Sequence, residues 1–271
     1  LLRGYIPPRD SSLLFIYSHM VEKGNYNIKT SPVLERVYRS ERGAAVRDTL
    51  LIFPKGMTSA DPELLSQMLR YLNEHFTVKN WGILFSGHGT AFLPAGFYDG
   101  EHSYSRYDDI QDIVFAPGKY NMLYGCVPDW VEKDPLVKTL SAEYGFSGDQ
   151  RVTREMDVNQ LRKCFPMHFK YIMMDSCLMG NMETAFALKD VCDYYGASPT
   201  EVLTTGFDYS KLSQYLLKYP EPDVKSVLEA YVDYYIRNHS SASISLVDCS
   251  LLDEFASMCR DIFAAHREAL D

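Results

Sequence analysis

The chain has 271 residues, of which 46% are hydrophobic and 23% are charged, a composition typical of folded globular proteins and not of disordered ones. Its 27 basic and 36 acidic residues give a formal net charge of −9, which argues against nucleic acid as the main partner because phosphate binding needs a basic surface. The sequence contains no run of about 18 apolar residues, so we expect no membrane-spanning helix.

The first half of the sequence combines predicted strands with one clear helix. Residues 13–17 are an apolar run of strand length, and residues 29–53 have the pattern of an exposed β-ribbon. A helix is predicted from Asp61, because a capping carboxylate and a first-turn proline precede apolar residues at helical spacing. Residues 81–85 are a second buried strand, and it runs into Ser86-Gly87-His88-Gly89.

The second half alternates strands and helices more regularly. Residues 90–152 are poor in periodicity and are interpreted as a long, partly irregular insertion. After it, the pattern predicts strands at 169–174, 201–205 and 244–247, and helices at 157–164, 178–190, 210–218, 223–237 and from about 250. This alternation predicts an α/β fold with a mostly parallel sheet covered on both faces, in a single domain spanning residues 1–271.

The six cysteines do not form a C-x-x-C pair. We therefore expect neither a structural zinc site nor a thioredoxin-type site. Most of these thiols are expected to be reduced, and several to be small core residues.

The residues best suited to catalysis lie at the ends of two predicted strands. His88 follows the strand at 81–85, and Cys177 follows the strand at 169–174. Ligands of open α/β sheets bind beyond the carboxyl ends of the strands, so the two side chains would meet if these strands are neighbours. A thiol beside an imidazole is an activated nucleophile. Gly89 would let the main chain approach a substrate carbonyl, with the N–H groups of Gly89 and Cys177 as an oxyanion hole.

A simpler interpretation stands beside this one. A single cysteine after a buried strand is more often a core residue, and a single His-Gly pair is more often a turn. Neither motif is specific alone; their joint placement after two apolar strands is what favours catalysis.

Residues 83–89 and 172–185 resemble the two catalytic blocks of the clostripain-like cysteine peptidases. The more specific block is Asp175-Ser176-Cys177-Leu178-Met179-Gly180, followed by Glu183-Thr184-Ala185. The resemblance extends over roughly residues 13–260 and is weakest at 90–150. It implies a caspase-like three-layer α/β/α sandwich and an endopeptidase that cleaves after Arg or Lys. It implies no cofactor, and it leaves a calcium requirement open.

The resemblance also implies roles for individual residues. His88 and Cys177 match the catalytic dyad, and Gly89 matches the glycine whose amide supports the oxyanion. Asp175 and Asp208, with Thr205 beside them, match positions that bind a basic P1 side chain. Alternatively, Asp175 is a strand-end carboxylate and Asp208 a turn carboxylate; Glu183 is interpreted as structural.

The sequence departs from the family pattern at its start. Residues 1–8 resemble the tail of a helix, so the family's first strand, which is central in the sheet, and most of its first helix are expected to be missing. The sequence is trimmed, or the segment lies on a separate fragment, or this alignment is wrong. Thr90-Ala91-Phe92 also replaces the usual Gly-Trp after the histidine block.

The leading hypothesis is thus a cysteine endopeptidase that uses a Cys/His dyad and a thioester intermediate. The alternatives are an inactive peptide-binding relative and another thiol hydrolase, such as an amidase or a transpeptidase. We expect a monomer that acts on peptides or proteins with a basic P1 residue, secreted or on the surface of a bacterium, with its targeting segment trimmed. A self-made activating cut is predicted within residues 94–151, with Arg106 as first choice and Lys119, Lys133 and Lys138 as other candidates; an uncut, ordered lid is the alternative.

Overall fold

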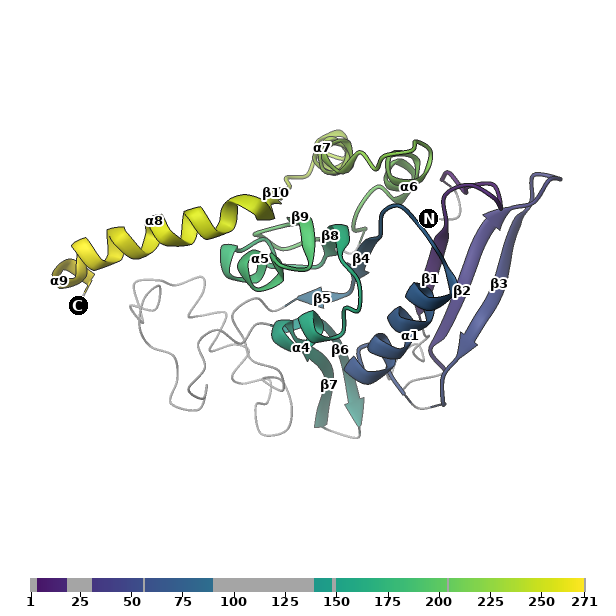
Figure 1. Ribbon diagram of the computed structural model, residues 1–271, viewed down its shortest axis with the longest axis horizontal. Coiled ribbons are helices and arrows are strands. Elements are labelled where there is room, and N and C mark those ends of the chain that lie inside the picture. The colour runs from purple at the N-terminus through teal and green to yellow at the C-terminus, as the bar shows by residue number, and fades with distance from the viewer. Residues whose placement is uncertain are drawn as a thin grey trace.

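The computed structural model describes residues 4–18, 31–55, 57–89, 139–147, 150–203 and 205–270, and its elements have the predicted mixed α/β character (Figure 1). The strands are β1 (Leu14–Ser18), β2 (Val33–Arg39), β3 (Ala45–Ile52), β4 (Gly82–Ser86), β5 (His88–Gly89), β6 (Thr139–Ser147), β7 (Gln150–Asp157), β8 (Phe169–Asp175), β9 (Cys192–Ala197) and β10 (Ser245–Asp248). The helices are α1 (Pro62–His75), α4 (Val158–Lys163), α5 (Met182–Leu188), α6 (Tyr209–Leu217), α7 (Val224–Arg237), the 3₁₀ turn η1 (Cys249–Leu251), α8 (Leu252–Ala265) and α9 (Arg267–Leu270).

The described strands form three sheets. The largest has the order β10-β9-β8-β4, in which β4, β8 and β9 are parallel and β10 is antiparallel to β9. A second sheet, β1-β2-β3, is antiparallel, as expected for the ribbon predicted at 29–53. The short β5 pairs with the hairpin β6–β7 in the third.

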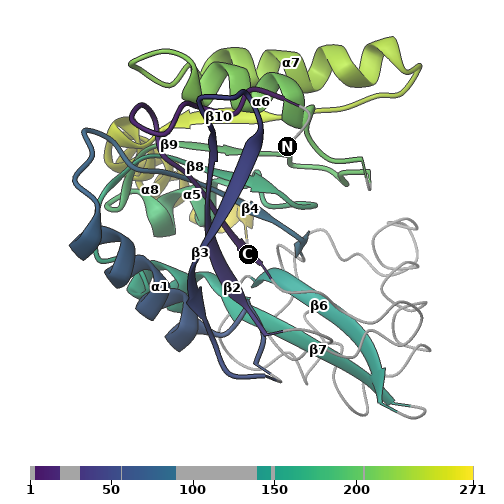
Figure 2. The same cartoon turned by 90° about the vertical axis from the view of Figure 1, so that its right-hand side faces the viewer.

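Strand β8 is buried on both faces, which explains its continuous apolar sequence. Ile172 and Met174 belong to a core cluster that also contains apolar residues of α1, α4, α5 and α8. Tyr171 and Met173 point to the other face, into a cluster built from α6 and α7. Figures 1 and 2 both show α6 and α7 on one side of β8 and β9, and α1 on the other. The sheet is therefore the middle of three layers.

Helix α1 begins where the sequence predicts. Asp61 caps it, accepting hydrogen bonds from the N–H groups of Glu63 (2.9 Å) and Leu64 (3.1 Å). The apolar residues at helical spacing are buried and face the core; they are Leu64, Leu65, Met68, Leu69 and Leu72.

Two expectations about local structure are corrected. The strand predicted at 201–205 is wrong: Glu201–Leu203 has no regular structure, and the strand is Cys192–Ala197, ahead of it in the chain. Four of its six residues are Asp, Tyr or Gly, so it lacks an aliphatic run, but it lies between β8 and β10. The predicted insertion at 90–152 ends in regular structure, because residues from Thr139 onward belong to the hairpin β6–β7.

Residues 90–138 lie outside the described residues. So do Arg106, Lys119, Lys133 and Lys138, and the proposed processing within 94–151 stays a prediction. Among the described cysteines, Cys164, Cys192 and Cys249 are buried, as expected for core residues. In the part of the chain that the structure describes, no helix combines the length and the apolar character needed to cross a membrane.

Candidate active site

The two predicted site blocks leave the same edge of the sheet, because they follow adjacent parallel strands. In the β4–β8 pairing, Phe85 lies opposite Met174, and Ser86 lies opposite Asp175. One residue further, the N–H of Gly87 donates to the carbonyl of Asp175 at 3.2 Å. The expectation that these strands are neighbours is therefore confirmed, and the segments holding His88 and Cys177 start side by side.

Gly89 lies directly against the main chain of Cys177. A Cβ atom built on Gly89 would be 2.4 Å from the carbonyl oxygen of Cys177 and 2.8 Å from Cγ of Met179. Real Cβ atoms do not approach other atoms so closely, so only glycine fits here without a shift of the main chain. The contact brings together the two segments that the sequence places 88 positions apart. For His88, only the main chain is described; it pairs with β6 opposite Ala142.

The thiol of Cys177 is half-buried and faces the loop that follows β9. The main-chain N–H of Val202 donates to its Sγ atom at 3.2 Å, and the carbonyl of Val202 lies 3.6 Å from the same atom. A sulfur that receives an N–H is held in place, and such a donor is the kind of partner that a thiolate accepts.

The turn after Cys177 has an unusual backbone. Leu178 has φ +62°, the left-handed region that is costly for a residue with a Cβ. Hydrogen bonds hold it there: the N–H of Leu178 donates to Thr200 at 3.0 Å, and the side-chain amide of Asn181 donates to the Leu178 carbonyl at 3.1 Å. Asn181 also caps α5, accepting from the N–H of Thr184 at 2.9 Å. Strained backbone of this kind is concentrated at functional sites.

The loop after β9 is fixed to this turn. The N–H of Gly180 donates to the carbonyl of Ser198 at 2.8 Å, and the Tyr195 hydroxyl donates to the Met179 carbonyl at 2.7 Å. Ser198 is fully buried, and its hydroxyl donates to the carbonyl of Thr200 at 3.0 Å. Cys177 therefore lies between two loops that are joined to each other by hydrogen bonds.

Asp175 is buried beneath the thiol segment, with 7% of its surface exposed. Burial raises the pKa of its carboxyl above the ordinary value, because it disfavours the charged form. Three donors oppose that shift: the Tyr209 hydroxyl, the Phe207 N–H and the Ser86 hydroxyl. Asp175 thus connects the ends of β4 and β8 to the turn that precedes α6.

That turn holds the other two predicted substrate-binding residues. Gly206 has φ +60°, and a Cβ there would be 2.4 Å from Oδ2 of Asp175, so the turn packs on the carboxylate. Thr205 is exposed, and its hydroxyl lies 3.2 Å from that of Tyr235. Asp208 is half-buried and caps α6 through Oδ1, which accepts from the N–H groups of Ser210 (3.2 Å) and Lys211 (3.3 Å) and from the Ser210 hydroxyl (2.5 Å).

The structure therefore brings Asp175, Thr205 and Asp208 into one neighbourhood, at the end of the strand that leads to Cys177. Their role in binding a basic side chain stays a prediction. Sequence reasoning missed Val202 and Tyr209 as contributors. Val202 acts through its main chain, which no residue type predicts, whereas Tyr209 directly follows Asp208, a residue that the resemblance already singled out.

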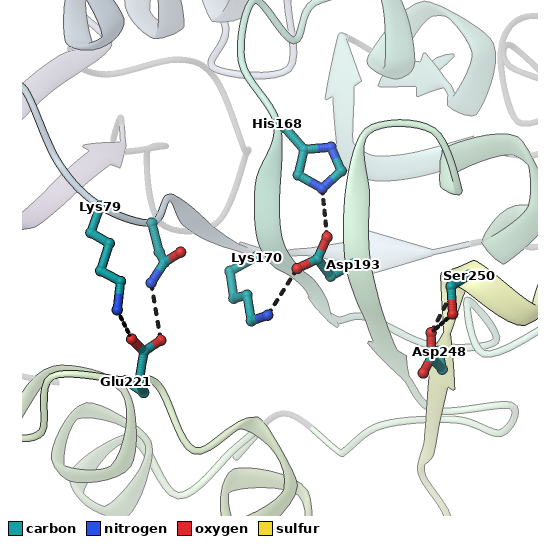
Figure 3. A network of polar contacts seen from close by, with 8 residues as sticks. Lys79, His168, Lys170, Asp193, Glu221, Asp248 and Ser250 are labelled. Carbon is teal, nitrogen blue, oxygen red and sulfur yellow. Dashed lines mark hydrogen bonds and ion pairs between the residues drawn. The ribbon is translucent and has the colours of Figure 1, made fainter.

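Among the described residues, no group of three or more His, Cys, Asp or Glu side chains is arranged to hold a metal ion. A charged network lies elsewhere, across the starts of β8 and β9. There Asp193 accepts from Lys170 at 2.9 Å and contacts His168 at 2.7 Å (Figure 3).

Part of the chain matches a known protein family. Residues 141–269 match the family model of the clostripain family, peptidase C11. No curated protein sequence matches the chain.

Solved structures resemble the whole described fold. An inactive zymogen C11 protease from Parabacteroides distasonis is 22% identical over 96% of this chain and 57% of that chain, with a TM-score of 0.65. A secreted C11 cysteine protease from Bacteroides thetaiotaomicron, in complex with an irreversible peptide inhibitor, is 20% identical over 93% of this chain and 60% of that chain, with a TM-score of 0.62. At this identity the likeness shows the fold, and the chain spans about 57–60% of the length of these proteins.

Proposed function

Residues 141–269 of this chain are clostripain-like in sequence, and from that premise we propose that the protein is a cysteine endopeptidase. The observation that carries the proposal is the contact of Gly89 with the main chain of Cys177 at the shared carboxyl edge of β4 and β8. Two segments that each carry one member of a thiol–imidazole pair start there from adjacent strands.

In the proposed reaction, the thiolate of Cys177 attacks the carbonyl carbon of the scissile peptide bond. The tetrahedral intermediate collapses to a thioester, and the amine leaves with a proton from His88. Water, deprotonated by His88, then hydrolyses the thioester and releases the second product. The chain needs no cofactor for these steps, and a thiol ionises readily enough that no third member of a triad is required.

A tetrahedral intermediate with a negatively charged oxygen forms twice, once when the thioester is made and once when water hydrolyses it. This oxygen needs nearby hydrogen-bond donors. The proposed donors are the main-chain N–H groups of Gly89 and Cys177. Two features support this assignment: only glycine fits at position 89, and the turn after Cys177 is held in a strained conformation by Thr200 and Asn181. Donors fixed before the reaction do not have to reorganise during it.

The proposed specificity is for Arg or Lys at P1, with Asp208, Asp175 and Thr205 forming the pocket. A buried guanidinium needs a carboxylate partner. The hydrogen bonds that cap α6 all use Oδ1 of Asp208, so they leave its Oδ2 for such a partner. Asp175 is more enclosed and already accepts three hydrogen bonds, so its proposed part is to hold the 206–209 turn in place as well as to contribute charge. Secretion, as for the secreted C11 protease from Bacteroides thetaiotaomicron, is part of the same proposal, and the substrates would then be peptides outside the cell.

A panel of fluorogenic peptides that differ only at P1 tests the proposal. We expect turnover with Arg or Lys, little with Leu or Asp, and none in Cys177→Ala. Cys259→Ala, at a half-buried cysteine on α8, is the matched control and should retain activity. Turnover that persists in Cys177→Ala would contradict the mechanism. Binding of the basic peptides without turnover in the unmodified protein would favour the alternative, an inactive peptide-binding relative.

A further inference from the structure

Two buried thiols lie in contact outside the proposed active site. The Sγ atoms of Cys192 and Cys249 are 3.6 Å apart, although the two residues are 57 positions apart in the sequence. Only 1% of the surface of Cys192 and 5% of that of Cys249 is exposed. Among the described cysteines, these are the two whose sulfur atoms contact each other, and the proposed reaction uses neither of them.

The pair joins two neighbouring strands of the mixed sheet. Cys192 is the first residue of β9, and Cys249 directly follows β10, at the start of the turn η1. Strand β10 pairs antiparallel with β9, in a register that places Asp248 opposite Tyr194. Both cysteines are members of the same core cluster. A covalent bond between them would therefore fasten η1, and with it the start of α8, to the sheet.

The two sulfur atoms are within reach of a disulfide bond. Such a bond is about 2.05 Å long, so the sulfur atoms have to approach by about 1.5 Å, and rotations of the two side chains about their Cα–Cβ bonds can supply this. Cys164 is the contrasting case. It is as deeply buried, but its Sγ donates to the main-chain carbonyl of Pro62 at 3.2 Å and to that of Gln160 at the same distance.

Cys249 can reach solvent through a small local opening. Asp248 and Ser250, on either side of it, are exposed, and β10 is a four-residue edge strand of the described sheet. The turn that covers the thiol is held by Asp248, which accepts from the N–H of Ser250 at 3.0 Å and from its hydroxyl at 2.6 Å (Figure 3). Short elements at an edge open at a lower free energy than the core does. A small reagent can therefore reach Cys249 without unfolding the sheet.

We propose that Cys192 and Cys249 are a disulfide-forming pair, oxidised by a small disulfide such as oxidised glutathione. First, the thiolate of Cys249 attacks one sulfur of oxidised glutathione, forms a mixed disulfide and releases one glutathione thiolate. The thiolate of Cys192 then attacks the sulfur of Cys249, forms the Cys192–Cys249 bond and releases the second glutathione thiolate. The protein thiols lose two electrons and two protons, and the two released glutathione molecules hold them as thiols.

The contact between the two thiols supports this order of attack. Their hydrogen bond raises the pKa of Cys192, as does burial, and it lowers the pKa of Cys249. Cys249 is also the member whose sequence neighbours are exposed, so it is the better attacking thiolate. An oxidising compartment would preserve the bond once it has formed. The inference does not depend on the proposed function, because it concerns only the junction of β9, β10 and η1.

Cross-link mapping tests the proposal. The sample is residues 1–271 with Cys177→Ala, to prevent self-digestion, and Cys259→Ala, which leaves Cys249 as the only thiol of the tryptic peptide 238–260. The folded protein is equilibrated with mixtures of oxidised and reduced glutathione, quenched with acid, unfolded, alkylated and digested with trypsin. Mass spectrometry should find the peptide 238–260 joined by a disulfide to the peptide 190–211, which contains Cys192.

Two further variants serve as matched controls. Cys192→Ala should remove the cross-link, whereas Cys164→Ala, at an equally buried thiol that bonds to main-chain carbonyls, should leave it unchanged. Absence of the cross-link in the folded protein would overturn the proposal. Cross-links from Cys249 to Cys164 as abundant as those to Cys192 would also overturn it, since they indicate oxidation of unfolded chains.

The coupling of the disulfide to folding gives a second measurement. If the pair fits the fold, half-reduction in the folded protein should need a ratio of squared reduced to oxidised glutathione at least about tenfold higher than in urea-unfolded protein. Amide exchange in β10 and η1 should slow on oxidation, with no change in the separate sheet β1-β2-β3. Equal or easier reduction in the folded protein would overturn the proposal, because the bond would then strain the fold.

Discussion

Among single residues, Gly89 is where the two segments of the proposed site meet. Gly89→Ala places a Cβ about 2.4 Å from the Cys177 carbonyl oxygen, so the main chain must move. A displacement near 1 Å costs about 100-fold in rate, and we expect a loss of at least that size in kcat/KM with unchanged far-ultraviolet circular dichroism. Gly196→Ala is the control, because its Cβ would meet only ordinary contacts at 3.5 Å. Equal activity of the two variants would remove Gly89 from the site.

Asp175 gives a prediction about pH. Its folded-state pKa is raised by burial, so the folded protein binds this proton more tightly than the unfolded chain. The stability that Asp175 contributes is thus present below the ordinary value of 3.8 and is lost as pH rises through the folded-state pKa. In urea unfolding, the free energy of the unmodified protein should fall relative to Asp175→Asn as pH increases through this range.

Asp193 provides the control of opposite sign. Its pKa is lowered, chiefly by the hydrogen bond from Lys170 and also by His168, so its contribution is present at higher pH and is lost as pH falls. The stability difference between the unmodified protein and Asp193→Asn should therefore grow with pH. If the difference in unfolding free energy between the unmodified protein and the variant changed in the same direction with pH for Asp175→Asn and Asp193→Asn, the account of Asp175 would be contradicted.

At the scale of elements, helix α6 allows the two roles of Asp208 to be separated. Asn caps a helix about as well as Asp, whereas Ala costs about 1 kcal/mol. We therefore expect Asp208→Asn to keep the free energy of unfolding and Asp208→Ala to lower it. If Asp208 binds a basic P1 group, both variants should lose at least about tenfold in kcat/KM for Arg and Lys substrates, since each removes the charge. Full activity of Asp208→Asn would leave Asp208 as a helix cap only.

Elements with a strong local signal could be predicted from the sequence, and β9 could not. Strand β8 is an apolar run because both of its faces are buried, and α1 has a cap and an apolar stripe. By contrast, Cys192–Ala197 is held by its neighbours β8 and β10, whereas the β-prone segment at 201–203 turns away to place Val202 against the thiol of Cys177. Tertiary contacts overrode local propensity at both places.

For the whole molecule, the sequence predicted which strand ends carry the candidate site, because residues after adjacent parallel strands must emerge at one edge. It could not predict the contact of Gly89 with Cys177 or the turn of Leu178 into the left-handed region. Both depend on contacts between loops that are far apart in the sequence.

The central claim is that Cys177 is the nucleophile of an endopeptidase for basic P1 residues, and covalent labelling tests it most directly. The protein is treated with an Arg-type or Lys-type acyloxymethyl ketone, and the adduct is located by peptide mass mapping. We predict one adduct, on Cys177, that is absent in Cys177→Ala and forms more slowly with a Leu-type reagent. An adduct on another cysteine, or none on Cys177 in the folded protein, would contradict the claim.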